Sequence, residues 1–170
     1  MTQLNIFYGK DEVAVLRYEP IDDVFSFEYS HDWKIRGFEL FPYMKFDSVI
    51  SNNVIKNFIE NLLPEGKGRE ILTNMYHISK NNLFALIQLI GKDTTGALTF
   101  NLEYNTFITS FKEISNIELS NRIKDRKNIP IAIWDGNVRL SIAGVQDKLP
   151  ITILDGKYGF AEGELASTHI

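Results

Sequence analysis

One stretch of the chain combines residue types and spacing that suit chemistry on phosphate groups: Leu140-Ser141-Ile142-Ala143-Gly144-Val145-Gln146-Asp147-Lys148. The pattern predicts the end of a strand, a tight turn of small residues and the start of a return strand. Such a turn brings backbone N–H groups together with no large side chain in the way, so it can bind phosphate oxygens. It lacks both the Walker spacing and the three-glycine dinucleotide pattern. An ordinary hairpin therefore fits the spacing as well as a phosphate loop does, and the polar groups of Gln146, Asp147 and Lys148 favour the loop slightly.

Other kinds of site find little support in the residue types. The chain has no cysteine, which excludes disulfides, thiolate catalysis and cysteine metal sites. Its histidines, His31, His77 and His169, are scattered without metal-ligand spacing, so we predict no metal site. The net charge of −4 argues against broad nucleic-acid binding. The densest basic patch, residues 122–127, is short and interrupted and indicates a solvated helix end.

The length and composition indicate a folded protein of one domain or two small ones. The 170 residues are 44% hydrophobic, which is enough for a real core. The N-terminus has no basic region followed by a long apolar run, and no apolar stretch nears the roughly twenty residues that a bilayer requires. Together with the lack of cysteine, these features predict a cytoplasmic protein with no membrane contact.

The elements that must hold the loop begin with strands. Apolar residues alternate over residues 4–8, 13–16 and 24–29, with turn residues between them. This spacing predicts an antiparallel meander with one buried face. A further edge strand, closed by proline, is predicted at Phe38–Pro42.

The apolar period then changes to that of helices. Three helices are predicted, around residues 54–63, 71–76 and 83–90. Asn52-Asn53 is the predicted N-cap of the first, and Asn81 or Asn82 that of the third, which Gly91 closes. A return strand is predicted at 96–100. The predicted fold class is α+β, with an antiparallel N-terminal sheet covered by about three helices.

The rest of the chain divides into a polar stretch and a strand-rich end. Residues 103–128 are weakly patterned, and we interpret them as a linker that holds at most a short helix around Ile117, Leu119 and Ile123. Strands are predicted over residues 137–142, 149–154 and 157–160. Asp155-Gly156, between the last two, is a strong hairpin signal.

Four segments, taken in order, resemble the HipA family, the serine/threonine kinase toxins of bacterial type II toxin–antitoxin modules. They are Asn61–Gly66, Ile90–Ala97, Leu140–Lys148 and Ser167–Ile170. Each segment alone is a weak signal, but their order and spacing match the family's N-terminal part across nearly the whole chain.

The resemblance implies a division of the chain and roles for the loop. Residues 1–102 would be the family's N-terminal subdomain, 103–128 a linker and 129–170 the incomplete, strand-rich start of a kinase-like N-lobe. The residues that would lie over the ATP phosphates are Ala143, Gly144, Val145, Gln146, Asp147 and Lys148. Ser141 matches the serine that family kinases autophosphorylate, and a phosphate there would repel nucleotide phosphates. A strand-end hydroxyl bonded to neighbouring backbone is the alternative for Ser141.

The resemblance also implies which chemistry is missing. ATP and Mg²⁺ are expected only in a completed kinase, because the family's acceptor-orienting aspartate and metal ligands come from a C-terminal lobe. We assign no catalytic residue and no metal ligand to this chain, and we expect no kinase activity from it alone. Glu65 and Asp93 are predicted to cap or brace turns, and His169 to be a strand residue with a local role.

The implied partners are a kinase C-lobe or full-length partner chain, and a HipB-like helix-turn-helix antitoxin that would connect the chain to DNA only indirectly. The chain stops at Ile170, before the lysine expected on the phosphates, which predicts a partner chain, an oligomer or a disordered end. The alternative function is a stand-alone, antitoxin-like module that binds a separately encoded kinase lobe. An unrelated α+β domain with a hairpin at 140–150 is the third hypothesis.

Overall fold

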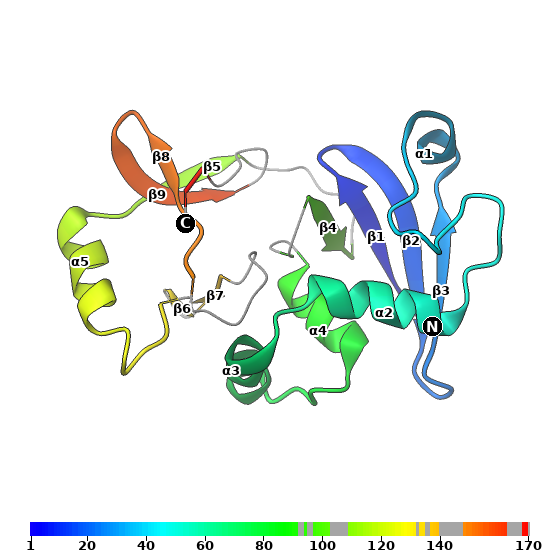
Figure 1. Ribbon diagram of the computed structural model, residues 1–170, viewed down its shortest axis with the longest axis horizontal. Coiled ribbons are helices and arrows are strands. Elements are labelled where there is room, and N and C mark those ends of the chain that lie inside the picture. The colour runs from blue at the N-terminus through cyan, green and yellow to red at the C-terminus, as the bar shows by residue number, and fades with distance from the viewer. Residues whose placement is uncertain are drawn as a thin grey trace.

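The computed structural model describes residues 1–91, 94, 97–102, 109–131, 133–134, 137–139, 148–162 and 168–169. Its elements form two units with separate cores, one up to Asn101 and the other from Ser110 onward (Figure 1). Within the described ranges, every helix is too short or too polar to cross a bilayer.

The first unit is built on an antiparallel sheet of four strands in the order β3-β2-β1-β4. In register, Leu4 lies opposite Leu16, and Leu16 opposite Phe27, so alternate residues of each strand share the core face. The predicted meander is confirmed, and the return strand pairs with β1. The strands are β1 (Thr2–Tyr8), β2 (Asp11–Glu19), β3 (Val24–Tyr29) and β4 (Leu98–Asn101).

In the part of this unit that the structure describes there are four helices: α1 (His31–Arg36), α2 (Asn52–Leu62), α3 (Gly66–Tyr76) and α4 (Leu83–Ile90). The predicted cap of α4 is confirmed, because the Asn82 side chain accepts a hydrogen bond from the Ala85 N–H and Gly91 follows the helix. The predicted cap of α2 is wrong by one residue, since the Ser51 hydroxyl takes that role. Asn52 instead accepts a hydrogen bond from the Phe25 N–H at 2.8 Å, which fastens α2 to the sheet.

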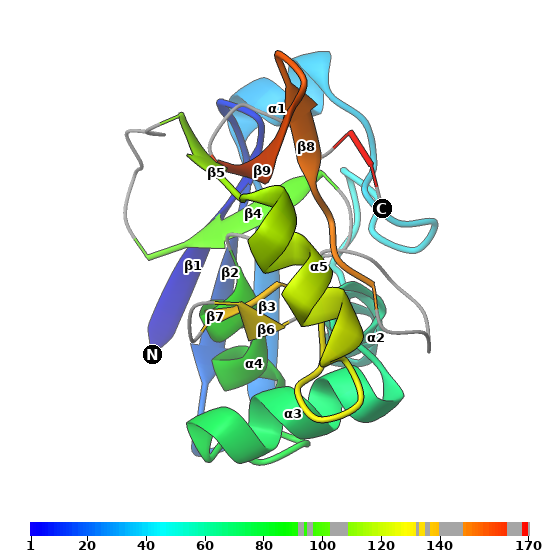
Figure 2. The same cartoon turned by 90° about the vertical axis from the view of Figure 1, so that its left-hand side faces the viewer.

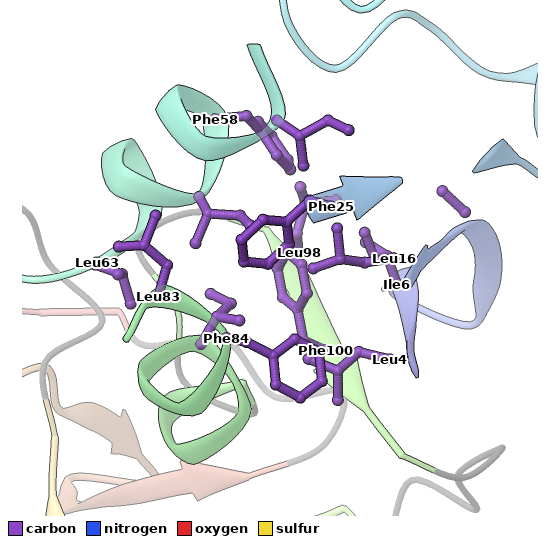
Figure 3. Packing of buried hydrophobic residues seen from close by; sticks show 14 of the residues in the cluster. Leu4, Ile6, Leu16, Phe25, Phe58, Leu63, Leu83, Phe84, Leu98 and Phe100 are labelled. Atoms are coloured by element: carbon purple, nitrogen blue, oxygen red, sulfur yellow. The ribbon is translucent and has the colours of Figure 1, made fainter. Parts of the chain in front are cut away.

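The core of the first unit lies between the sheet and helices α2 and α4. Figure 3 shows side chains of both helices pointing toward those of the strands. Phe84 of α4 stacks on Tyr18 of β2 with ring centroids 5.0 Å apart. Fully burying a large apolar side chain contributes about 1.5–3 kcal/mol, so this cluster dominates the stability of the unit.

Two features between β3 and α2 differ from the sequence prediction. The helix α1 was not predicted; the Ser30 hydroxyl caps it, and Trp33 is its one buried residue. The predicted edge strand at Phe38–Pro42 is wrong, because side chains occupy its backbone groups. The Leu40 N–H donates to the Tyr29 hydroxyl at 2.9 Å, and the Phe38 carbonyl accepts from the Trp33 indole at 2.9 Å.

The described residues of the second unit form one helix and two small sheets, of orders β5-β9-β8 and β6-β7. Asp155 and Gly156 adopt left-handed φ angles of 49° and 75° and join β8 to β9, as the hairpin signal predicts. Figure 2 places α5 and this hairpin together, in front of the first sheet. The elements are β5 (Ser110–Glu113), α5 (Asn116–Lys124), β6 (Ile133–Trp134), β7 (Asn137–Val138), β8 (Thr152–Leu154) and β9 (Lys157–Glu162).

The stretch expected as a linker contributes to this second unit. Phe111 of β5 lies opposite Ala161 of β9, and Ile114, just after β5, is 3% exposed in the second core. Lys157 Nζ lies 2.7 Å from Glu113 Oε2, and this hydrogen bond raises the pKa of Lys157. Residues 110–124 therefore pack with the later strands, and α5 includes the predicted short helix.

Candidate functional site

The structure describes the two ends of the predicted phosphate loop. Ser141, Ala143, Gly144, Val145, Gln146 and Asp147 lie outside the described residues, so their proposed roles stay predictions. Lys148 is described and half-buried, and Leu149 after it is 6% exposed in the second core. Before the loop, Arg139 is the last described residue.

Beyond the loop, the chain meets the segment that contains His169. The Ile151 N–H donates to the His169 carbonyl at 3.0 Å, and the His169 N–H donates to the Ile151 carbonyl at 2.9 Å. The Thr168 hydroxyl accepts from the Ile153 N–H at 3.0 Å. His169 is thus held by an antiparallel bridge to Ile151, which agrees with a strand-like local role.

A row of cations and aromatic rings, the cation–aromatic row, lies before the loop. It consists of Arg122, Trp134, Phe160 and Arg139. The Arg139 guanidinium carbon lies 4.0 Å from the centroid of the Phe160 ring, and the rings of Phe160 and Trp134 meet edge to face at 5.3 Å. The guanidinium carbon of Arg122 lies 5.4 Å from the centroid of the Trp134 ring. The row connects α5, β6 and β9 to the residue that follows β7.

Helix α5 holds its end of this row by polar contacts. The Trp134 indole N–H donates to Glu118 at 3.2 Å. The Arg122 guanidinium donates to the carbonyls of Pro130 and Ile133. Arg122, the first residue of the basic patch, therefore binds within the fold. Its contact with Trp134 is not predicted from the sequence.

The family segment at residues 61–66 forms the turn between α2 and α3. Glu65 occupies the N-cap position of α3, in agreement with the predicted turn role, although its side chain makes no cap hydrogen bond. Arg69 braces the turn instead, because its guanidinium donates to the Pro64 carbonyl at 3.1 Å and pairs with Glu60 at 2.5 Å.

The family segment at residues 90–97 joins α4 to β4. A Cβ atom at Gly91 would overlap the backbone carbonyl of Phe100, so only glycine permits this close approach. Thr94 is 2% exposed, and its hydroxyl donates to the Leu98 carbonyl. The role predicted for Asp93 lies outside the described residues. The described part of this segment serves packing rather than chemistry.

A cavity that the sequence did not indicate lies beside α1, with a volume of about 430 Å³. Trp33 forms part of its wall and contacts the half-exposed rings of Tyr8 and Phe38, with centroids 5.7 and 5.2 Å away. Acidic and basic side chains both line the cavity, including Lys10, Glu12, His31, Asp32 and Arg36. No three His, Asp or Glu side chains in the described part of the chain gather as metal ligands.

Comparison with known proteins identifies the class of protein that this fold and these segments define. A family model described as the HipA N-terminal domain matches residues 4–101, and the chain belongs to the HipA family. It is 40% identical over 169 residues to the serine/threonine-protein kinase toxin HipA of Shewanella oneidensis. That match covers 98% of this chain and 39% of the toxin.

Two further comparisons agree with this assignment. The solved complex of Shewanella oneidensis HipA with HipB and operator DNA contains a similar chain, with a TM-score of 0.77 and 39% identity over 97% of this chain and 39% of that one. The Sinorhizobium fredii protein Y4mE is 28% identical over 130 residues, which covers 71% of this chain and 30% of Y4mE. The chain is thus homologous to the N-terminal part of HipA kinase toxins and spans less than half the length of these relatives.

Proposed function

We propose that this chain supplies the N-terminal subdomain and the ATP phosphate loop of a HipA-type serine/threonine kinase toxin. The similarity to HipA, which runs through the loop and the His169 segment, carries this proposal. The geometry supports it, because both ends of the loop rest on the second core, through Arg139 and Leu149. The proposed division is residues 1–102, a connection at 103–128, whose residues 110–124 pack with the later strands, and the start of the kinase N-lobe at 129–170.

In this proposal, Ala143 to Lys148 bind the nucleotide phosphates through backbone N–H groups and the Lys148 ammonium. Ser141 is the regulatory phosphorylation site, since a phosphate there adds nearly two negative charges beside the nucleotide phosphates. ATP and Mg²⁺ would bind once a C-terminal lobe supplies the metal ligands and the aspartate that orients the acceptor. A chain lacking that lobe therefore transfers no phosphate. The proposed role as part of a HipA-type kinase also implies a cytoplasmic location.

The test is a chimera in which residues 1–170 replace the matching part of the Shewanella oneidensis toxin. We expect Mg²⁺-dependent transfer of labelled γ-phosphate from ATP to the chimera and none to residues 1–170 alone. Lys148→Ala should weaken ATP binding at least tenfold, whereas the control Lys127→Ala, outside the loop, should not change it. A folded chimera without labelling, beside an active native toxin, would refute the proposal.

A HipB-like antitoxin is the proposed protein partner, because the structural relative was solved with HipB and operator DNA. We expect the chimera to co-purify with Shewanella oneidensis HipB and to shift operator DNA only when HipB is present. A shift by the chimera alone would contradict the indirect contact with DNA that the net charge of −4 also favours.

A second candidate is a separate regulatory module, which the surface of the first unit favours. Tyr8 and Phe38 are 42% and 52% exposed and lie beside the cavity at α1, and exposed aromatic side chains are common in protein interfaces. Residues 1–102 alone would then bind a HipA kinase lobe and suppress its activity. A pull-down with the C-terminal part of the Shewanella oneidensis toxin distinguishes the two proposed functions. Only a separate regulatory module should bind that part without residues 129–170.

A further inference from the structure

The cavity beside α1 lies between the turn that joins β1 to β2 and the helix itself. Its walls come from residues 10–12 on one side and from residues 30–33 and 36 on the other, and all of them are described. Its volume of about 430 Å³ falls within the range of roughly 300–1,000 Å³ that is common for binding pockets. The phosphate loop proposed above involves none of these residues.

Trp33 is the one apolar side chain that lines this cavity, and the fold holds its ring in place. The indole N–H donates to the Phe38 carbonyl at 2.9 Å. A Cβ atom at Gly37 would overlap the indole, so the backbone there packs directly against the ring. The Tyr8 ring lies against it with centroids 5.7 Å apart. A group that enters the cavity therefore meets an aromatic wall that is already positioned.

The polar walls of the cavity carry an excess of negative charge. Two fixed cations and three carboxylates line it, those of Lys10, Arg36, Asp11, Glu12 and Asp32. With histidine neutral, the formal charge of the lining is −1 (2 − 3). Arg36 lies 3.8 Å from Asp32, so these two charges offset each other within α1. Asp11 is exposed whereas Glu12 is half-buried, which makes Asp11 the carboxylate most accessible to a ligand.

We propose that this cavity binds an arginine side chain of a partner protein. A cation is attracted to aromatic rings, most strongly to indole, and the planar guanidinium donates hydrogen bonds to carboxylates in a fixed geometry. Trp33 and Asp11 supply these two partners from opposite walls. Lysine suits the site less well, because its ammonium is more strongly hydrated and has no flat face to lay on the ring.

The surroundings of the cavity favour a protein segment over a small free cation. The rings of Tyr8 and Phe38, which both contact Trp33, are 42% and 52% exposed. They offer apolar surface to the residues that flank the arginine, and an arginine beside aromatic side chains is a common anchor in protein interfaces. The inference goes beyond both proposed functions, because it depends on neither the phosphate loop nor a kinase lobe.

The test is an NMR titration of the full chain with the peptide acetyl-Leu-Arg-Leu-amide. We expect chemical-shift changes at the amides of residues 10–12 and 30–36 and at the Trp33 indole N–H, with a dissociation constant on the order of 1 mM. The same peptide with citrulline, the neutral isostere of arginine, should bind about fivefold more weakly or less. The lysine peptide should lie between the two.

Two carboxylate variants separate this site from general attraction between charges. Asp11→Asn should weaken binding of the arginine peptide about two- to fivefold, the size expected for an exposed ion pair. The control Asp22→Asn removes an equally exposed acid from the turn that follows β2 and should leave binding unchanged. Trp33→Phe should also weaken binding, and if that variant does not fold, the citrulline peptide on the native chain decides.

Four results would overturn the proposal. Equal binding of the arginine and citrulline peptides would show that the site does not recognise a cation, and equal losses in Asp11→Asn and Asp22→Asn would show that it has no fixed place. Binding of free arginine as tight as that of the peptide would assign the cavity to a small molecule. Shifts of the same amides on raising the protein concentration without peptide would assign it to a second copy. An inactive chimera would refute the proposed kinase role without altering these results.

Discussion

The two units of the chain differ most in the size of their cores. Among the described residues, the first unit buries 21 apolar side chains in one cluster, and the second buries four. The first packs helices on one open sheet, whereas the second consists of short strands around Trp134 and Phe160. The larger core joins a whole sheet to its helices, while the smaller one contains Leu149, directly after the predicted phosphate loop, and Phe160, which contacts Arg139 before it.

Most of the buried apolar surface thus lies in one part of the chain, and the residues proposed to bind ATP lie in the other. Among the described residues, the four buried side chains of the second core contribute much less burial free energy than the 21 of the first. We therefore expect the first unit to be the more stable of the two.

The largest expected effect comes from producing the two parts separately. Residues 1–102 should fold alone and unfold in one cooperative thermal transition, because their core stays intact. Residues 103–170 should show no cooperative transition. Far-UV circular dichroism during heating measures the transition of each polypeptide. A sharp melting transition of residues 103–170 alone would contradict the difference in stability between the two units.

A matched pair of glycine substitutions tests the same contrast inside the whole chain. A Cβ at Gly91 would overlap the Phe100 carbonyl, and one at Gly159 would lie 2.5 Å from the Lys112 carbonyl and from the Phe111 ring. Gly91→Ala should lower the free energy of unfolding of the first unit by about 2–3 kcal/mol and leave it folded. Gly159→Ala should remove the protection of β5, β8 and β9 altogether.

Hydrogen exchange of the two sheets distinguishes these outcomes. Gly9→Ala is the control, because nothing lies within 4 Å of a Cβ there and only its φ of +60° is strained. Its expected cost is about 1 kcal/mol. Equal losses of protection in the two units after the paired substitutions would contradict the dependence of stability on core size.

Tyr29→Phe should have a smaller effect, confined to the first unit. The Tyr29 hydroxyl donates to the Met44 carbonyl and accepts from the Leu40 N–H, both at 2.9 Å, and the residue is 5% exposed. Removing it leaves two backbone groups without that partner and should cost about 1–2 kcal/mol in chemical denaturation. Tyr43→Phe, at a ring that is 72% exposed, should cost almost nothing.

The smallest effects concern one ion pair in each unit, with opposite dependence on pH. The hydrogen bond from Lys56 holds the pKa of Asp23 below its ordinary 3.8, so this contribution is present above that pH and is lost as the pH falls. The hydrogen bond to Glu113 raises the pKa of Lys157 above 10.5, so that contribution is lost as the pH rises past it.

Denaturation of Lys56→Met and Lys157→Met across the pH range measures this difference. Lys56→Met should flatten the acid side of the stability curve of the first unit. Lys157→Met should flatten the alkaline side of the protection of β5 and β9. A change on the same side in both variants would show that these pairs do not set the pH response.

The sequence predicts the first unit well because its elements bury one face each. The alternation of β1 to β3 and the helical spacing in α2 and α4 follow from the core they share. The apolar spacing does not predict helix α1, because only Trp33 of its six residues is buried. The stretch Phe38–Pro42 alternates like a strand, but the side chains of Tyr29 and Trp33 bind its backbone.

The second unit is harder to predict because its elements bury little. Every residue of β5 is exposed or half-exposed, so no apolar period distinguishes this strand from a linker. The phosphate-loop residues are predicted from the four spaced segments rather than from periodicity, and they stay a prediction. The contacts at the ends of the loop depend on Arg139 and Phe160 meeting across the fold, which no local pattern contains.

The pairing of β1 with β4 also has a consequence for synthesis on the ribosome. Strands β1 to β3 are consecutive and can pair as soon as Tyr29 has left the exit tunnel, whereas Asn5 must wait for Asn101. Until then the edge of β1 is uncovered, although α2 and α4 emerge earlier and can already cover the core face of the meander. The nascent chain therefore passes through a stage in which an unfinished sheet needs protection, and slower translation before Asn101 would prolong that stage.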